Sequence, residues 1–327
     1  MTIDYNICRF DGADLCGLGE LGSLFFEGSE KKVEMVFDAR QGSLRSWPRE
    51  IWADIVAKAN ATILSTVSDQ HCDAFLLSES SLFVYDDRLI MITCGETSLV
   101  SAIEEIFLHA DLENLRLLVF ERKNEMEPEQ QPTAFGDDVN YLKSIVDGEA
   151  VRLGGKEGNF VHCFYYAREN QPLENDVTLE ILMHDLDPIA EDLFIKPKRQ
   201  HLYQETGIQK VFPRFKTDDY FFDPMGYSLN SIGGGDYYTI HVTPQSHCSY
   251  ASFETNYVFQ NDFHKTIEKV LAIFKPGSFS ILLFEGENQP ELSLPKFEMK
   301  HREIRQIAGY RVRFYDFEDP ESANTRH

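Results

Sequence analysis

Short links between strand-like segments constrain this fold more than any other feature of the sequence. Leu82–Tyr85 and Leu89–Thr93 are rich in strand-favouring residues, and only three polar residues separate them, which predicts a β-hairpin. Further strand-like segments lie in the C-terminal half, at Tyr237–Thr243, Ser249–Glu254 and Ser278–Phe284. Because short links join neighbouring antiparallel strands, we expect mostly antiparallel sheet.

Three segments with apolar residues at helical spacing accompany the strands. The first has Ser46 as its N-cap and the second begins near Thr97. The third begins at Asn261 or Asp262 and ends at Phe274. Amphipathic helices of this kind cover sheet faces, so the pattern indicates the α+β class.

The chain offers no clear domain boundary. It has 327 residues, and we expect one domain over residues 1–327. The polar segment Lys123–Gly136 is typical of a loop, and we expect the tail after Asp316 to be frayed. No repeat with a period of 20 to 50 residues is found, which excludes solenoids and propellers.

Charge limits the possible partners. The chain has 54 acidic and 31 basic residues, a net charge of −23, which disfavours nucleic-acid and membrane partners and favours a cationic ligand. It has no long apolar run and no export signal, so we expect a soluble protein that is not exported. Its six scattered cysteines are expected to be free thiols in a reducing compartment, the cytoplasm.

Several short motifs are set aside. Gly17–Gly22 matches the dinucleotide-binding pattern, but the segment after it favours a strand over the required helix. Ser29–Lys32 matches SxxK without its companion motifs, and Gly233–Gly235 is typical of a loop. Two histidines and a cysteine lie close in sequence without further ligands, so we expect no metal; they are His241, His247 and Cys248.

The segment Leu76–Gly95, LLSESSLFVYDDRLIMITCG, decides the interpretation. On chemistry alone it is a hairpin with a serine-rich entry. Its LSESSLFV and TCG motifs, however, resemble the self-processing site of the eukaryotic-type S-adenosylmethionine decarboxylase family. Other blocks are similar to that family, in the same order along the chain: FFEGSEKKVE at 25–34, TLEILMHDLDP at 178–188, DPMGYSLN at 223–230, and IHVTP with SFETN within 240–256.

The resemblance implies the fold and the cofactor. The fold would be a four-layer α/β/β/α sandwich with two antiparallel sheets. The chain would cut itself between Glu79 and Ser80, giving a β chain of residues 1–79 and an α chain of residues 80–327. Ser80 would become a pyruvoyl group that forms a Schiff base with the substrate amine, with neither metal nor pyridoxal phosphate.

Catalytic roles follow from the same resemblance. Ser80 Oγ would attack the carbonyl of Glu79, and Ser228 would donate a hydrogen bond to the developing oxyanion. His241 would remove the Ser80 α-proton, and Cys94 would protonate the decarboxylated carbon. Without the motif, Cys94 would be a small buried hydrophobe.

The resemblance also implies substrate contacts. Phe26 and Phe222 match the rings that sandwich the adenine, and aromatic faces suit a sulfonium cation. Gln245 stands where the family usually has a glutamate that holds the ribose, and exchanging a charge-assisted hydrogen bond for a neutral one weakens binding by about 1 kcal/mol. Further candidate contacts are Leu77, Glu27 and Glu30, and Glu79 is a supporting candidate for the catalytic set.

A possible activator site is the last implication. Four carboxylates match those that bind putrescine in animal members of the family: Glu34, Asp176, Glu180 and Glu254. Ile92, however, occupies the place of a family lysine, so putrescine activation stays a hypothesis. The alternative is that these acids pair with Lys and Arg side chains or line a solvated surface.

Three functions stay open. The chain decarboxylates S-adenosylmethionine to supply the aminopropyl donor for spermidine and spermine synthesis, acts on another amino acid through the same pyruvoyl chemistry, or is an inactive paralogue that regulates a partner. Retention of the four catalytic positions favours an enzyme. A homodimer is an open alternative to a monomer.

Overall fold

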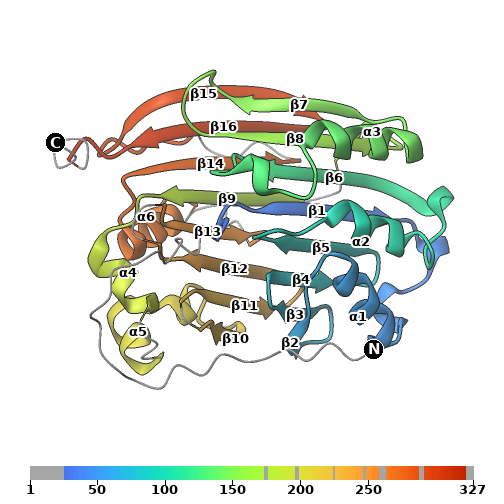
Figure 1. Cartoon of the computed structure of the whole chain (residues 1–327), viewed down its shortest axis with the longest axis horizontal. Coiled ribbons are helices and arrows are strands. Elements are labelled where there is room, and N and C mark those ends of the chain that lie inside the picture. Colours follow the sequence, from blue (N-terminus) through green and yellow to red (C-terminus); the bar gives the residue numbers. More distant parts are fainter. Residues whose placement is uncertain are drawn as a thin grey trace, which may run out of the picture.

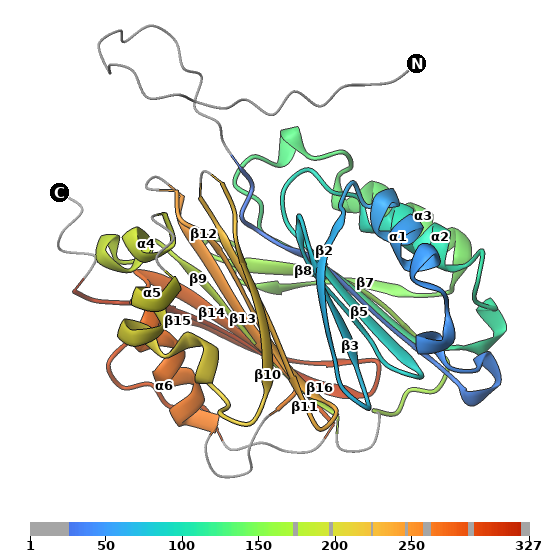
Figure 2. The same ribbon diagram turned by 90° about the horizontal axis from the view of Figure 1, so that it is seen from below.

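Two antiparallel sheets of eight strands face each other, and helices cover the outer face of each (Figures 1 and 2). The computed structural model describes residues 26–172, 176–195, 199–223, 225–245, 248–257, 263–286 and 291–321. The order of layers is helix, sheet, sheet, helix, as the edge-on view in Figure 2 shows. The predicted four-layer α+β sandwich is therefore confirmed.

The first sheet comes from the N-terminal half of the chain. Its strand order is β2-β3-β4-β5-β1-β6-β8-β7. The bounds are β1 Lys31–Phe37, β2 Ile63–Ser68, β3 Asp73–Leu77, β4 Ser80–Val84, β5 Arg88–Thr93, β6 Leu115–Lys123, β7 Glu149–Gly154 and β8 Phe160–Ala167. β4 and β5 are the hairpin predicted from the sequence.

The second sheet comes from the C-terminal half. Its order is β10-β11-β12-β13-β9-β14-β16-β15, the first order with eight added to each number. The bounds are β9 Val177–His184, β10 Lys216–Phe221, β11 Tyr227–Gly233, β12 Asp236–Thr243, β13 Tyr250–Thr255, β14 Ser278–Glu285, β15 Glu298–Ile307 and β16 Tyr310–Glu318. The two halves thus share one topology, and the repeated unit is longer than the 20 to 50 residues of a solenoid or propeller repeat.

In the described ranges, six α-helices and two apolar cores form the outer layers. The helices are α1 Arg49–Lys58, α2 Leu99–Ile106, α3 Phe135–Ile145, α4 Pro188–Ile195, α5 Arg199–Thr206 and α6 Phe263–Phe274. Buried residues such as Ile55 and Ile103 pack with Val33 and Met35 of the first sheet. A second core does the same beneath α4, α5 and α6. Alternate residues of each strand therefore point to the helices or to the other sheet.

The space between the sheets is apolar at both sides and polar in the middle. Val119 and Phe314 belong to one apolar cluster between the sheets, and Phe83 and Tyr237 belong to another. Between these clusters, charged and hydroxyl side chains from both sheets meet. A buried polar group is costly unless it is paired, so this region marks the candidate site.

Some predicted boundaries need correction. Ser46 is not the N-cap of α1, because it lies in a preceding 3-10 turn and Pro48 precedes the helix. The expected frayed tail after Asp316 begins inside β16, which continues to Glu318. The expected loop after Lys123 contains a short 3-10 turn, Pro128–Gln130, and α3 begins within its last residues.

Of the remaining predictions, some are tested by the structure and others concern residues outside the described ranges. Gly234 and Gly235 form the turn of the β11–β12 hairpin with positive φ, whereas Gly233, also predicted in the loop, is the last residue of β11. α2 begins at Leu99 after a Ser98 side-chain cap, close to the predicted start. Residues outside the described part include Gly17–Gly22, Asn261, Asp262, His247 and two of the cysteines, Cys8 and Cys16.

Candidate active site

The predicted scissile bond lies in the tight turn between β3 and β4. Leu77 pairs with Ser80, so Ser78 and Glu79 are the two central residues of the hairpin. Ser80 is fully buried and has φ +126°, a conformation that a residue with a side chain rarely adopts. Backbone strain of about 1–3 kcal/mol is therefore located at the predicted nucleophile.

Cys94 contacts both residues of this bond. Ser80 Oγ donates to Cys94 Sγ at 3.4 Å, and the Cys94 N–H donates to the Glu79 carbonyl oxygen at 3.0 Å. Burial, with the nearby Glu79 carboxylate, raises the pKa of the Cys94 thiol well above its usual value. The side chain is therefore a protonated thiol at neutral pH and can act as a proton donor.

His241 on β12 is held between the two sheets by partners on both ring nitrogens. Its Nδ1 lies 2.5 Å from Oε1 of Glu30, which also accepts from Ser252 Oγ at 2.6 Å. Its Nε2 lies 2.8 Å from Ser81 Oγ and 3.1 Å from Thr239 Oγ1. A neutral ring with its proton on Nδ1 presents Nε2 as an acceptor, the state of a general base.

Asn230 fixes the hydroxyl side of this network. Its Nδ2 donates to the Phe75 carbonyl at 3.1 Å, so its Oδ1 faces the hydroxyls and accepts from Ser81 Oγ at 2.6 Å. The imidazole thus contacts Ser81, the residue after the predicted nucleophile. Ser228 pairs with His241 in the β11–β12 register and is buried, so it lies on the face directed at the first sheet.

A cavity of about 230 Å³ lies beside the hairpin turn and contains Glu79 and Phe26 in its wall. The other lining residues are Glu27, Asn60, Gly95, Glu96, Thr97, Gln130 and Gln131. Phe26 is 38% exposed, enough to offer a ring face to a ligand. Gly95 has φ +65°, and a Cβ there would lie 3.0 Å from both Glu79 Oε2 and the Phe26 ring, so only glycine leaves this space open.

The carboxyl of Glu79 faces this cavity in an unusual state. Its Oε2 is buried and has no hydrogen-bond partner in the described part of the chain. Burial raises the pKa of Glu79 to about 7, and the Lys31 ammonium opposes that rise. A buried carboxyl with an unused oxygen is a candidate ligand contact.

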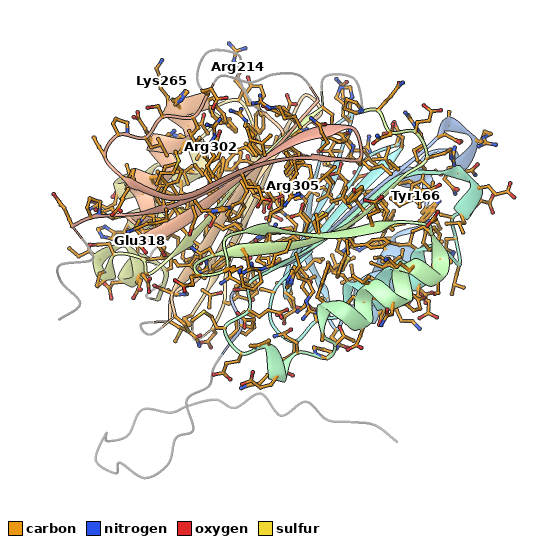
Figure 3. The ribbon with its side chains drawn as sticks, turned by 90° about the horizontal axis from the view of Figure 1, so that it is seen from above. Tyr166, Arg214, Lys265, Arg302, Arg305 and Glu318 are labelled. Atoms are coloured by element: carbon orange, nitrogen blue, oxygen red, sulfur yellow. The ribbon has the colours of Figure 1, made fainter. Side chains whose placement is uncertain are left out.

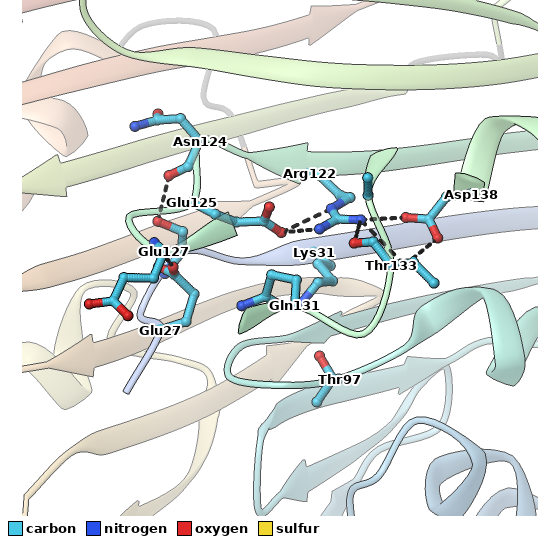
Figure 4. A network of polar contacts seen from close by, with 12 residues as sticks. Glu27, Lys31, Thr97, Arg122, Asn124, Glu125, Glu127, Gln131, Thr133 and Asp138 are labelled. Carbon is cyan, nitrogen blue, oxygen red and sulfur yellow. Dashed lines mark hydrogen bonds and ion pairs between the residues drawn. The ribbon is translucent and has the colours of Figure 1, made fainter. Parts of the chain in front are cut away.

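The other predicted substrate contacts have varied surroundings. The Glu27 carboxylate accepts from the N–H groups of Ser29 and of two loop residues (Figure 4), and Leu77 is buried in the core of the first sheet. Gln245 Oε1 accepts from the Phe26 N–H at 3.3 Å, which joins Phe26 to the second sheet. Phe222 is half-buried just after β10.

The predicted acidic cluster is filled by cations of this chain. Lys32 Nζ lies 2.8 Å from Glu180 and 3.0 Å from Glu254, and Lys123 pairs with Glu180 and Glu121. Burial alone would lower the pKa of Lys32, but Glu180 and Glu254 hold it well above its usual value. At Glu180, burial alone would raise the pKa of the carboxyl, but Lys123 and Lys32 outweigh burial and lower this pKa to about 2. Lys32, Lys123 and Glu180 are therefore charged partners of one another, whereas burial raises the pKa of Glu254 and of Glu121 to about 7.

The remaining two acids of this cluster pair with Arg88. Its guanidinium lies 2.9 Å from Asp176 and 3.3 Å from Glu34, and Tyr310 Oη donates to Asp176 at 2.6 Å. The cavity between these side chains is about 10 Å³, space for one water molecule at most. These ion pairs agree with the alternative interpretation, in which the acids pair with Lys and Arg side chains, and putrescine binding stays a hypothesis.

No group of three or more His, Cys, Asp and Glu side chains in the described ranges is arranged to hold a metal ion. Within the same ranges, no helix is long and apolar enough to cross a membrane.

The fold and the site together define a class of protein. A two-sheet sandwich with a strained, buried serine against a thiol, and a carboxylate-oriented imidazole nearby, has the parts of an enzyme for acyl and proton transfer. A family model described as adenosylmethionine decarboxylase matches residues 23–323. The chain belongs to this family, and the resemblance inferred from its motifs is confirmed.

Individual relatives are similar to this chain over most of its length. The chain is 35% identical over 318 residues to an S-adenosylmethionine decarboxylase proenzyme of Dictyostelium discoideum, covering 87% of this chain and 83% of that protein. A proenzyme of Drosophila melanogaster is also 35% identical, with 89% and 90% covered. The crystal structure of a Trypanosoma brucei AdoMetDC-delta26 monomer superimposes with a TM-score of 0.59 at 25% identity, covering 73% of this chain and 98% of that one.

Sequence reasoning missed several residues of the site. Ser81, Asn230 and Thr239 hold the imidazole, and Lys32 and Lys123 fill the acidic cluster. One signal was available: Lys32 and Lys123 are charged residues of two strands that are otherwise rich in apolar residues, such as Val33 and Phe120. Buried lysines of that kind need acidic partners, but the partner strand cannot be read from the pattern.

Proposed function

We propose that this chain is a self-processing decarboxylase of S-adenosylmethionine that cleaves itself between Glu79 and Ser80. Its family membership supports the reaction class. The observation that carries the assignment of the bond is the strained Ser80, whose Oγ lies beside Cys94 and next to the polarised Glu79 carbonyl. The product is the aminopropyl donor of spermidine and spermine synthesis.

Cleavage proceeds through an ester. Ser80 Oγ attacks the Glu79 carbonyl carbon, and the Ser80 nitrogen takes up a proton and leaves, so the amide becomes an ester. The Cys94 N–H stabilises the oxyanion, and relief of the positive φ favours the reaction. Ser228 is assigned as a second donor to that oxygen. Its buried position opposite His241 supports this role.

Elimination then separates the chains. His241 removes the Ser80 α-proton, and the main-chain carboxylate of Glu79 leaves from the Ser80 β-carbon. Hydrolysis of the resulting dehydroalanine releases ammonia and leaves a pyruvoyl group at position 80. The Glu30 carboxylate supports the base role, because it stabilises the positive charge that the ring gains with the proton.

Decarboxylation uses the cavity beside residue 80. The pyruvoyl group supplies the electron sink for the bond to carbon dioxide. Phe26 offers a ring face to the adenine, and Glu79, Glu27, Glu30, Leu77, Phe222 and Gln245 stay candidate contacts. Cys94 holds a proton on a thiol that is neutral at working pH, which suits it to protonate the product carbon.

We further propose that turnover is independent of putrescine. Lys32, Lys123 and Arg88 pair with the four predicted carboxylates, and the remaining cavity of about 10 Å³ is far smaller than a four-carbon diamine. An equal rate of cleavage and of carbon dioxide release with and without putrescine is expected. A rate increase that saturates with putrescine would contradict this proposal.

We also propose that the protein acts in the cytoplasm. The four described cysteines are free, and three of them are buried. One of these is Cys94, whose assigned role requires a reduced thiol. Loss of activity on mild oxidation, restored by a thiol reductant, is the expected result.

Release of labelled carbon dioxide from carboxyl-labelled S-adenosylmethionine tests the function. The wild-type chain is expected to release it and the S80A variant is not, because S80A lacks the nucleophile. A panel of other amino acids is the control for substrate choice. Faster release from one of them would replace S-adenosylmethionine as the substrate, and no release from any would indicate an inactive paralogue.

A further inference from the structure

Gln131 belongs to a segment that forms one wall of the substrate cavity. The segment from Asn124 to Ala134 is tied down at several points (Figure 4). The Glu27 carboxylate accepts from the N–H of Met126 at 2.8 Å, and Ser29 Oγ donates to the Asn124 carbonyl at 2.8 Å. The buried Arg122 binds this segment and the start of α3 through Glu125, Thr133 and Asp138. The wall is therefore held in a defined position.

Lys31 fixes the orientation of the Gln131 amide. Lys31 Nζ donates to Gln131 Oε1 at 2.6 Å and to the carbonyl of Gly95 at 3.0 Å. An ammonium group has only donors, so the amide oxygen must face Lys31 and the amide nitrogen must point away from it. In the described part of the chain, Gln131 Nε2 is buried and has no hydrogen-bond partner.

An unused buried donor in the wall of a ligand cavity calls for an acceptor from the ligand. Leaving such a donor unpaired costs more than a typical hydrogen bond contributes, so native proteins rarely do so. The cavity holds one unused donor on Gln131 and one unused acceptor, Oε2 of Glu79. Phe26 lines the same cavity, and its partly exposed ring offers a planar base a face to stack on beside these two groups.

We propose that Gln131 is a further substrate-binding residue, whose Nε2 donates to an acceptor atom of the adenosyl group, and that Lys31 is the positioning residue that orients it. This inference rests on the proposed function. Lys31 and Lys32 are adjacent on β1, so their side chains point to opposite faces of the sheet. Lys32 pairs with the second sheet, whereas Lys31 binds the cavity wall. The role of Lys31 is thus separate from the buried charge cluster.

The sharpest test compares Q131E with Q131M. A glutamate keeps an oxygen for Lys31 but has no donor at the second position, whereas methionine loses both. If Nε2 donates to the substrate, both variants bind S-adenosylmethionine about 2- to 12-fold more weakly or worse. If Gln131 only ties the wall to Lys31, Q131E binds as the wild type does, and the proposal is overturned.

A second ligand tests whether Gln131 binds the adenosyl half of the substrate. 5′-Methylthioadenosine carries the adenosyl group without the amino acid, and its dissociation constant is measured by calorimetry on fully cleaved protein. We expect Q131E to weaken this ligand by the same factor as the substrate. An unchanged constant for 5′-methylthioadenosine would overturn the assignment to the adenosyl group.

A pH profile tests the positioning role of Lys31. Burial lowers the pKa of Lys31 to about 8; around it, Glu125, Glu27, Glu79 and Cys94 face its ammonium together with the cation Arg122. A neutral amine can accept from the amide, so the amide can turn and withdraw Nε2 from the ligand. KM is therefore expected to rise above about pH 8 in the wild type, whereas K31R stays charged and removes that rise. A rise of equal size in K31R would contradict the role.

Two controls separate the outcomes. E129Q changes an exposed residue of the same segment and is expected to bind normally. Chain cleavage is measured by mass for every variant, because the cleavage chemistry does not use Gln131. A wild-type chain that neither cleaves nor binds substrate would refute the proposed function itself, whereas normal wild-type binding with normal Q131E binding refutes only this inference.

Discussion

His241 Nδ1 and Glu30 Oε1 lie 2.5 Å apart and join the two sheets at the active site. Glu30 precedes β1 in the first sheet and His241 lies on β12 of the second, 211 residues later. Tyr250 Oη and Ser252 Oγ also donate to Glu30, so its carboxylate is fixed before any ligand binds. The assigned base is thus oriented by the packing of the sandwich.

Replacing Glu30 by Gln should slow chain cleavage at least about tenfold. The amide can accept the Nδ1 proton but cannot stabilise the positive imidazolium that forms when Nε2 takes a proton. The fraction of cleaved chain is followed over time on denaturing gels. Glu50→Gln, an exposed change on α1, is the control, and cleavage of Glu30→Gln at the wild-type rate would refute the orienting role.

Cys94→Ser should separate the two reactions. The backbone N–H of residue 94, which polarises the Glu79 carbonyl, remains, so cleavage should stay within about tenfold of the wild type. Loss of the thiol removes the proton donor, and carbon dioxide release should fall about 10²- to 10⁴-fold. Both rates are measured on one preparation. An equal loss in the two rates would show that the thiol has no separate role.

Lys32→Met should strongly destabilise the fold. Removal of the ammonium leaves Glu180 and Glu254 buried without one of their cations, which costs about 3–5 kcal/mol for a buried pair. Urea unfolding measures the free energy of unfolding. Lys58→Met, which removes an exposed ion pair to Glu105, is the matched control and should change it by less than about 1 kcal/mol. Similar losses in the two variants would contradict the importance of the buried cluster.

Glu79 should make stability depend on pH in a defined direction. Its pKa is raised to about 7 in the fold from 4.5, so the folded chain binds more protons between these values, and the free energy of unfolding falls as pH rises through that window. Glu121 and Glu254 act in the same direction. In an uncleaved S80A chain, the added substitution Glu79→Gln should reduce this fall. An identical pH profile with and without Glu79→Gln would contradict the raised pKa.

The sequence was sufficient to predict the class of fold and the β4–β5 hairpin, whereas the catalytic role of Ser80 came from the family resemblance and stays a prediction. Periodicity and turn residues are local signals, so they locate elements well. The layer count came from the resemblance to a known family, because period-2 alternation does not say how many sheets pack together.

The polar partners of the site could not be predicted from local patterns. Ser81 meets Asn230 and His241 only because the β4 and β11–β12 registers bring them to one level between the sheets. Similarly, the lysine at position 32 finds Glu180 across the sandwich, 148 residues away. Such contacts depend on the register and on the sheet spacing, which no short segment of sequence determines.

The intact mass of the purified chain tests the central claim most directly. The account predicts two chains, residues 1–79 and residues from 80 onward, with the second beginning in a pyruvoyl group in place of serine. The S80A variant should give one uncleaved mass. A wild-type protein that stays a single chain of full mass, or that is cut at another bond, would contradict the account.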